Sequence, residues 1–306
     1  MKIAIMGSGG VGAYVGARLQ DVGAEVHFIA RGAHLKALQT DGLRIEMPGK
    51  DLHLPKVAAT DQPADVGPVD LIVFAVKLWD TEAAALQMQP MVGPNTRILT
   101  LQNGIDSLDL IRAQHPNAVV LGGVIYVSAV IDRPGVIRSP GGFHRIVMDR
   151  HGGDAIAAEL AALADKSSGL DVVLADDAQT VIWEKFIALS SFSGATSLLR
   201  ARIGEILANA ETRAFLRDLL TETMAVGLAA GIRVRPELED ESVAKLQTMP
   251  PSFRSSMSED LERGKPLELR WLSGRVHALG LELGVPTPAH TAVYRGLVLH
   301  AGGKAE

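Results

Sequence analysis

A glycine-rich run near the start of the chain has the spacing G-x-G-x-x-G and comprises Gly7, Ser8, Gly9, Gly10, Val11 and Gly12. Between a strand and a helix, this spacing can hold the pyrophosphate of a dinucleotide on the free N–H groups at the helix N-terminus. The apolar residues 3–6 before the run predict a buried strand, and residues 13–19 after it predict a helix. Because the motif is informative only in that setting, we predict a dinucleotide site here.

Arg31 decides which dinucleotide is expected. It follows a predicted strand at residues 25–30. Sites for NAD usually have Asp or Glu about 20 residues past the glycines, to accept a hydrogen bond from the ribose 2′-hydroxyl, whereas an arginine there suits a 2′-phosphate. A guanidinium can bind phosphate through two parallel hydrogen bonds. We therefore predict NADP(H); the alternative is a solvated loop arginine.

Two more polar residues follow predicted buried strands. Lys77 ends the apolar run at residues 70–77, and Asn103 follows the run at residues 96–101. Ligands of doubly wound sheets bind outside the carboxyl ends of the strands. The glycine run, Arg31, Lys77 and Asn103 all fall at such ends, so we expect them to share one edge of a sheet. Asn103 could instead serve only a turn with Gly104.

Strands and helices alternate through the first half of the chain, which predicts an α/β Rossmann domain with a doubly wound, mostly parallel sheet. Residues 43–47 and 53–57 indicate a hairpin insertion around Pro48 and Gly49. From about residue 176 helical periodicity takes over, with segments at 181–189, 208–230, 242–248, 268–283 and 288–299. We predict an NADP-binding domain at residues 1–175 and an all-α substrate and catalytic domain at residues 176–306, with the active site in the cleft between them.

The composition excludes several classes of function. The 306 residues carry a net charge of −5, so no basic surface for nucleic acid or an anionic membrane is expected. No apolar run approaches the ~20 residues of a membrane span. The chain has no cysteine, and its nine histidines show no H-x-x-x-H spacing, so no metal site is expected. No G-x-S-x-G elbow for serine hydrolysis is present. The lack of cysteine is typical of a cytoplasmic protein.

Six motifs resemble those of one enzyme family, at residues 6–12, 30–32, 76–77, 101–104, 183–185 and 255–257. Glu268 lies twelve residues past Ser256, as the family spacing requires. On these motifs the chain resembles the ketopantoate reductases (2-dehydropantoate 2-reductases) over nearly its whole length. These are NADPH-dependent enzymes of pantothenate and coenzyme A biosynthesis. The resemblance implies a Rossmann domain followed by an all-helical domain.

The resemblance also implies a role for each matching residue. Lys185 would be the general acid that protonates the developing alkoxide, and Glu268 would hold Lys185 or a substrate hydroxyl. Asn103 would contact the nicotinamide ribose and the substrate. Lys77 would contact the cofactor, and Ser256 the substrate. For Lys185 the alternative is a solvated helix lysine, and for Glu268 an ordinary charged surface.

The chain departs from the family after Lys185. The family commonly has asparagines four and eight residues later, where this chain has Leu189 and Ser193. Leucine can neither donate nor accept a hydrogen bond, so the substrate pocket is expected to be less polar. Ser193 is retained as a candidate substrate ligand, and the neighbouring serines at 190, 191 and 197 could compensate in part.

This departure leaves three functions open. The first is reduction of a 2-keto acid by NADPH, with 2-dehydropantoate the leading substrate. The second is a related 2-keto acid, β-hydroxyacid or opine-type dehydrogenase with a less polar pocket. The third is a catalytically silent protein that senses NADP(H). The expected partner is a small 2-keto acid, and the sequence leaves open whether the protein is a homodimer.

Overall fold

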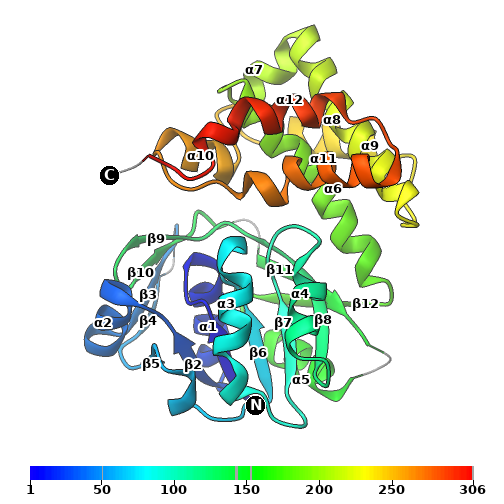
Figure 1. Cartoon of the computed structure of the whole chain (residues 1–306). Helices are drawn as coiled ribbons and strands as arrows, with labels where there is room; N and C mark the ends of the chain where they lie inside the picture. The colour runs from blue at the N-terminus through cyan, green and yellow to red at the C-terminus, as the bar shows by residue number, and fades with distance from the viewer. Residues whose placement is uncertain (50, 142–143, 152–153, 305–306) are drawn as a thin grey trace. The chain divides into compact units, whose positions relative to one another are not determined.

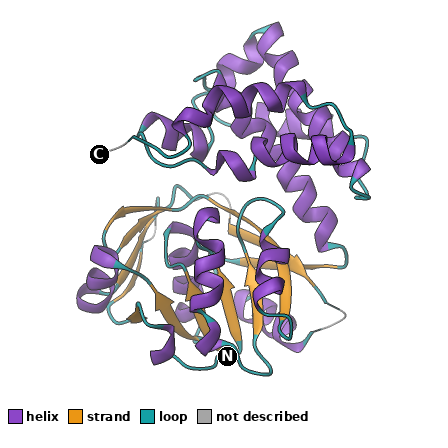
Figure 2. Cartoon of the chain, in the orientation of Figure 1, coloured by secondary structure: helices purple, strands orange, loops and turns teal. Residues whose placement is uncertain are grey.

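The computed structural model describes residues 1–49, 51–141, 144–151 and 154–304. The chain forms two compact units, Met1–Ala178 and Gln179–Glu306. Within the described residues, strands occur only in the first unit, and the second unit consists of helices and loops (Figure 2). Among these residues no helix is long and apolar enough to cross a membrane.

The first unit is built on an eight-stranded sheet, as the sequence predicts (Figure 1). In spatial order its strands are β12 (Asp171–Ala175), β11 (His144–Asp149), β8 (Val119–Val127), β7 (Arg97–Thr100), β6 (Leu71–Phe74), β1 (Lys2–Met6), β2 (Glu25–Ile29) and β5 (Ala58–Thr60). All neighbouring pairs are parallel except β8 and β11, which are antiparallel. Strands β11 and β12 were not expected from the sequence.

Five helices accompany this sheet: α1 (Gly10–Asp21), α2 (Gly32–Asp41), α3 (Thr81–Gln87), α4 (Ser107–Gln114) and α5 (Ala155–Ala164). Strand β1 contributes to a core on each face of the sheet, because successive side chains of a strand point to opposite faces. Ile3 and Ile5 belong to the core formed with α1 and α5. Ala4 and Met6 belong to the core formed with α3 and α4. This two-sided burial explains the uninterrupted apolar run before the glycines.

A second, four-stranded sheet has the order β4 (Leu52–Leu54), β3 (Leu43–Glu46), β10 (Val136–Arg138) and β9 (Val130–Arg133). The predicted hairpin is confirmed, since β3 and β4 pair antiparallel with Leu43 opposite Leu54. The parallel pairing of β3 with β10 was not expected. It joins segments about 90 residues apart, which local sequence patterns do not reveal.

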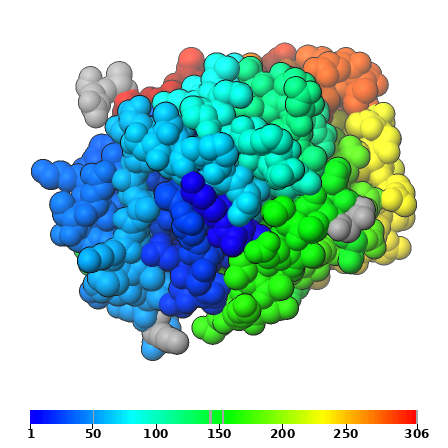
Figure 3. Space-filling model, turned by 90° about the horizontal axis from the view of Figure 1, so that it is seen from below, coloured from blue at the N-terminus to red at the C-terminus, as the bar shows by residue number. Residues whose placement is uncertain are grey.

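The first two residues make contacts at the sheet edge that carries the amino ends of the parallel strands. Seen from below, the dark-blue start of the chain lies among cyan and green segments of the first unit (Figure 3). The Lys2 ammonium donates to the Val66 carbonyl at 2.7 Å. The amino group of Met1 lies 3.5 Å from a Glu159 carboxylate oxygen. This edge is occupied by protein contacts, and the candidate site lies at the opposite edge.

The second unit contains seven α-helices in its described part: α6 (Ala178–Leu198), α7 (Ile203–Ala208), α8 (Ala210–Ala229), α9 (Leu238–Gln247), α10 (Ser256–Glu262), α11 (Ser273–Leu283) and α12 (Pro288–Leu297). The helix expected at residues 208–230 is α8, which begins just after Asn209; this asparagine has an extended backbone and caps α8 by accepting from the N–H groups of Glu211 and Thr212. Helix α10 was not expected. Helix α6 continues nine residues beyond the predicted end at 189, and its last turns are buried.

Candidate active-site residues

The predicted site residues of the first unit leave the sheet along one edge. Met6 is paired with Ile29 on one side and with Phe74 on the other, and Phe74 is paired with Thr100. The carboxyl ends of β1, β2, β6 and β7 therefore lie in one row. The glycine loop, Arg31, Lys77 and Asn103 follow these four ends within a few residues.

The glycine loop has the geometry of a phosphate cradle. Gly7 has φ +96°, and a Cβ there would lie 2.7 Å from the Val76 backbone nitrogen, so only glycine fits. A Cβ on Gly12 would collide with the Gly7 carbonyl, which shows how closely α1 approaches the end of β1. At Gly9, by contrast, no described atom beyond its chain neighbours lies within 4 Å of a Cβ position. The backbone at Gly9 is open to a ligand.

The backbone N–H groups of this loop divide into one that bonds to the protein itself and three that could bind a ligand. Ser8 is buried, and its N–H donates to the Ile29 carbonyl at 3.0 Å, which fixes the loop to β2. The first N–H groups of α1 belong to Gly10, Val11 and Gly12, and a helix provides no acceptor for these within itself. Phosphate would be held by these three groups, and the backbone of Ser8 would position the loop.

A small hollow of about 40 Å³ opens beside Gly7 and Arg31. Its lining combines apolar and charged residues from the ends of β1 and β2, the segments after β5 and β6, and helix α3: Met6, Gly7, Ile29, Arg31, Asp61, Val76, Asp80, Ala83, Ala84 and Gln87. The Arg31 Nη2 atom lies 3.2 Å from an Asp80 carboxylate oxygen. The hollow adjoins the carboxyl ends of β1 and β2, where a doubly wound fold receives the adenosine half of a dinucleotide.

Gln102 links the loops that carry Lys77 and Asn103, and no individual role was predicted for it from the sequence. Its side-chain amide donates to the Val76 carbonyl at 3.0 Å and to the Thr81 hydroxyl at 2.9 Å. The Lys77 ammonium lies over the Trp79 ring, 5.5 Å from its centre. Asn103 is half-buried and precedes Gly104. Gln102 thus positions the loops of two candidate residues. The one sequence signal for this role was its position inside the motif at residues 101–104.

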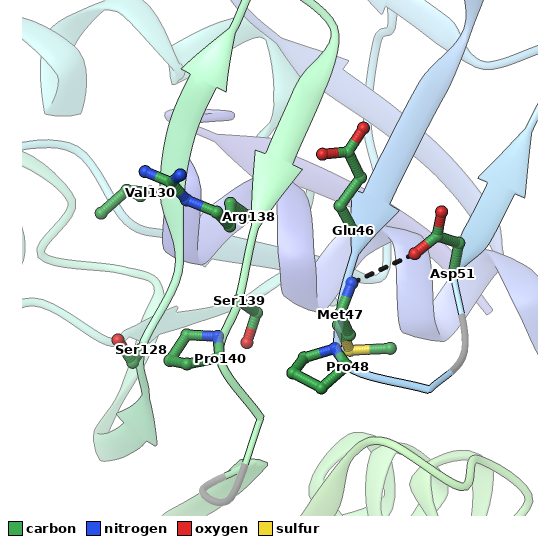
Figure 4. A pocket seen from close by; sticks show the side chains of 9 residues that line it. All are labelled: Glu46, Met47, Pro48, Asp51, Ser128, Val130, Arg138, Ser139 and Pro140. Atoms are coloured by element: carbon green, nitrogen blue, oxygen red, sulfur yellow. Dashed lines mark hydrogen bonds between the residues drawn. The ribbon is translucent and has the colours of Figure 1, made fainter.

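A larger hollow of about 550 Å³ lies at the second sheet, and none of the predicted site residues lines it (Figure 4). Its lining residues come from β3, β9, β10 and adjoining loops: Glu46, Met47, Pro48, Asp51, Ser128, Val130, Arg138, Ser139 and Pro140. Its charged groups already have protein partners, since Glu46 pairs with Arg133 at 2.6 Å and Arg138 with Asp132 at 3.2 Å.

Lys185, in the second unit, is a titratable residue whose surroundings lower its pKa. It lies on α6, and burial lowers its pKa from 10.5 to about 8. The negative charge of Glu268 acts in the opposite direction, and the positive charge of Lys245 lowers the pKa further. Glu268 is itself buried, in the turn Glu268–Trp271. A lysine with a pKa near 8 can give up its proton near neutral pH, as a general acid must.

Trp183 fixes the helix turn that carries Lys185. Its ring is buried and meets Phe186 edge to face, with ring centres 5.6 Å apart. It also lies against Gly227 of α8, where a Cβ would come within 3.2 Å of the ring. The Trp-x-Lys motif therefore combines a packing residue with a charged one, and the packing sets the direction in which Lys185 projects.

The other candidate substrate residues differ in accessibility. Ser256 is exposed at the first position of α10. Its neighbour Ser255 caps α10 through the Ser258 N–H and lies 2.8 Å from the Thr196 hydroxyl of α6, so Ser256 is held close to that helix. Ser193 is fully buried, and its hydroxyl has no hydrogen-bond partner among the described residues.

Two of the remaining serines of α6 bond to their own helix, whereas the buried Ser197 hydroxyl, like that of Ser193, has no hydrogen-bond partner among the described residues. Ser190 and Ser191 are buried and donate to the Ile187 carbonyl of their own helix. Leu189 is half-buried one turn beyond Lys185, so an apolar side chain stands beside the ammonium-bearing face. Over the described ranges, no group of three His, Asp or Glu residues is arranged to hold a metal ion.

Two family models match the chain. Residues 3–153 match the model described as "Ketopantoate reductase PanE/ApbA", and residues 177–300 match its C-terminal counterpart. The chain belongs to the ketopantoate reductase family. It is similar to a 2-dehydropantoate 2-reductase of Mesorhizobium japonicum, with 31% identity over 96% of this chain and 95% of the relative. A second such relative, of Archaeoglobus fulgidus, is 30% identical over 93% of this chain and 92% of its own.

Solved structures agree with the observed fold. A PanE/ApbA family ketopantoate reductase of Ralstonia eutropha JMP134 superposes with a TM-score of 0.90 at 32% identity, covering 98% of both chains. A D-mandelate dehydrogenase with NADH and anilino(oxo)acetate superposes with a TM-score of 0.88 over 98% of both chains, but at 24% identity it bears on the fold alone. Family membership makes the protein a pyridine-nucleotide-dependent oxidoreductase that acts on a CH–OH group.

Proposed function

We propose that the protein reduces a 2-keto acid to the 2-hydroxy acid with NADPH, and that 2-dehydropantoate is the leading substrate. The observation that carries this proposal is the half-buried Lys185, whose ammonium has its pKa lowered by desolvation to about 8 and is influenced by the carboxylate of Glu268. The open backbone at Gly9 and the arginine at position 31 support NADP(H) as the cofactor. The relatives named 2-dehydropantoate 2-reductase support the substrate.

When bound, the nicotinamide would supply a hydride to the carbonyl carbon of the keto acid. The chain's own part is to manage the charge that develops on the carbonyl oxygen. The positively charged ammonium of Lys185 would stabilise the negative charge on that oxygen and then donate a proton to it. The carboxylate of Glu268 would keep the ammonium protonated and oriented before the transfer. Asn103 and Lys77 would hold the nicotinamide half, braced by Gln102.

Leu189 favours a second candidate substrate, a 2-keto acid with an apolar side chain. The family asparagine it replaces could hydrogen-bond a substrate hydroxyl, and leucine cannot. The hydroxyls of Ser193 and Ser197, both without a partner among the described residues, are polar groups of α6 that could take that role. A site that has lost one polar partner should discriminate less against substrates that lack the hydroxyl.

A panel of 2-keto acids tests the proposal by following NADPH oxidation at fixed pH. It should include 2-dehydropantoate, its analogue without the hydroxyl, and aliphatic and aromatic keto acids, each also with NADH. Turnover of 2-dehydropantoate with the highest kcat/KM supports the leading substrate, and a higher value for the analogue supports the second. If the protein binds NADPH but turns over none of the keto acids, the proposed reductase activity would be contradicted and an NADP(H)-sensing function favoured.

We also propose that the protein acts in the cytoplasm and that it forms a homodimer. A relative from Staphylococcus aureus is described as a dimeric ketopantoate reductase, with a TM-score of 0.79 at 22% identity. Light scattering on the eluting peak of a size-exclusion column measures the mass directly. A peak at the 32.5 kDa of one chain over the micromolar range would contradict the dimer.

A further inference from the structure

Arg31 already has a negatively charged partner in this structure. Its Nη2 atom lies 3.2 Å from the Asp80 carboxylate, and the two side chains are 71% and 36% exposed. The residues come from different loops, since Arg31 follows β2 and Asp80 ends the turn Leu78–Asp80 after β6. Both line the hollow beside Gly7 where the adenosine half of a dinucleotide is expected.

The hollow that this pair lines is small, with a volume of about 40 Å³. A ligand larger than a few water molecules would displace side chains of the lining or extend beyond the hollow. The side chains of Arg31 and Asp80 are exposed enough to move, and Asp61 adds a second carboxylate to the lining.

The charges of the lining act differently on the two nicotinamide cofactors. A 2′-phosphate carries a charge of about −1.5 to −2 and would meet two carboxylates as well as one guanidinium. A ribose 2′-hydroxyl has no charge and can donate a hydrogen bond to a carboxylate, which is how sites for NAD use an acidic residue. The same hollow therefore holds one group suited to NADP(H) and two suited to NAD(H).

We propose that Asp80 is a specificity-determining residue for the cofactor: it competes with the 2′-phosphate for Arg31 and accepts a hydrogen bond from the 2′-hydroxyl when the phosphate is absent. Asp80 thereby lowers the preference for NADP(H) that Arg31 creates. The inference rests on the proposed function in one respect, that the glycine loop and Arg31 hold the dinucleotide.

The test is direct binding of NADPH and NADH to the full chain without a keto acid, followed by cofactor fluorescence. Asp80→Asn keeps the size of the side chain and removes its charge. We expect the Kd for NADPH to fall about threefold to tenfold, the range set by an exposed ion pair and a nearby like charge. The Kd for NADH should stay the same or rise, so the selectivity ratio moves toward NADPH.

Two controls separate pairing with Arg31 from a general loss of charge. Asp61→Asn removes a carboxylate from the same hollow, but the Asp61 side chain bonds to Gln62 rather than to Arg31. It should change the selectivity ratio less than Asp80→Asn does. In an Arg31→Ala background, Asp80→Asn should have a smaller effect on NADPH, because the competition for Arg31 is gone and only the repulsion between Asp80 and the phosphate remains.

The outcomes distinguish this inference from the proposed function. Whether the wild type prefers NADPH tests the proposed cofactor, whereas the shift caused by Asp80→Asn tests the role of Asp80, whichever cofactor the wild type prefers. Equal effects of Asp80→Asn on both cofactors, or an undiminished effect in the Arg31→Ala background, would overturn the inference. Binding of neither cofactor by the wild type would overturn both.

Discussion

Lys185 is a charged residue in a desolvated setting, and substituting it should lower the rate of the reaction without weakening cofactor binding. A positioned general acid typically contributes ~10² to 10⁴ in rate, so we predict that Lys185→Ala lowers kcat by that order. The Kd for NADPH should change little, because the residues proposed to hold the cofactor belong to the first unit. Lys185→Arg should not restore the rate, since a guanidinium does not release its proton near neutral pH. Wild-type turnover by Lys185→Ala in a stopped-flow assay would assign the proton to another group.

The pH profile of the reduction follows from the charges around Lys185. Its pKa of about 8 predicts that kcat/KM for the keto acid falls as the pH rises through about 8, because only the protonated lysine can donate. Glu268 raises this pKa, so Glu268→Gln should move the falling limb to lower pH. Lys245 lowers it, so Lys245→Met should move the limb to higher pH.

These two variants are controls for each other, since their shifts have opposite signs. If both variants shift the falling limb of the pH profile in the same direction, or if neither variant shifts it, a group other than Lys185 titrates in the profile. The reverse reaction needs the neutral amine as a base, so its rate should rise over the same pH range.

The position of a single residue was predictable where spacing along the chain defines it. The glycine run and Arg31 follow the carboxyl ends of β1 and β2, as their spacing predicts, and their roles in binding stay predictions. The partners of Arg31 and the role of Gln102 could not be found in this way, because they depend on which loops the parallel sheet brings side by side. The burial of Ser190 and Ser191 was equally hidden, since a serine on an apolar helix can bond to its own backbone.

Elements were predictable where one segment determines its own structure. Strand β1 and the hairpin of β3 and β4 follow from local patterns, whereas the pairing of β3 with β10 depends on contacts between distant segments. Helix α8 was predicted to within two residues, and its start follows a local signal, because Asn209 precedes it and asparagine is among the best N-caps of a helix. Helix α10, with Ser255 as its cap, carried the same kind of signal.

Helices α8 and α12 are joined by a histidine that should make the protein sensitive to acid. His290 is fully buried, and its Nε2 atom lies 2.7 Å from the Thr223 hydroxyl and 3.0 Å from the Leu219 carbonyl. Burial lowers its pKa from 6.5 to about 4. The unfolded chain therefore binds a proton between these pH values and the folded chain does not, so stability is lost as the pH falls from about 6.5 to about 4.

The shift sets an upper value of about 3 kcal/mol for the loss in the free energy of unfolding, at 1.36 kcal/mol for each pKa unit. Urea unfolding at several pH values measures it, with His290→Gln as the comparison. We predict a flatter pH dependence for the variant below pH 6.5, even where the variant is less stable at pH 7. Parallel curves for the two proteins would show that His290 does not titrate in this way.

At the scale of the whole molecule, the two units carry different parts of the proposed reaction. The glycine loop, Arg31 and the hollow beside it belong to Met1–Ala178, and Lys185 and Glu268 belong to Gln179–Glu306. Each unit builds its part from its own contacts: the row of strand ends in the first, and the Trp183 and Ser255 contacts in the second. Cofactor recognition and proton donation should therefore vary independently.

A double substitution tests this division. Arg31→Ala should weaken NADPH binding about tenfold to a hundredfold, since a charge-assisted hydrogen bond contributes about 1.5–3 kcal/mol, and should leave NADH almost unchanged. Combined with Lys185→Ala, its effect on kcat/KM for NADPH should be the product of the two single effects, as expected for sites that share no partner. A combined loss much smaller than that product would mean that Arg31 and Lys185 act on a common step, because residues that work as a unit are far from additive.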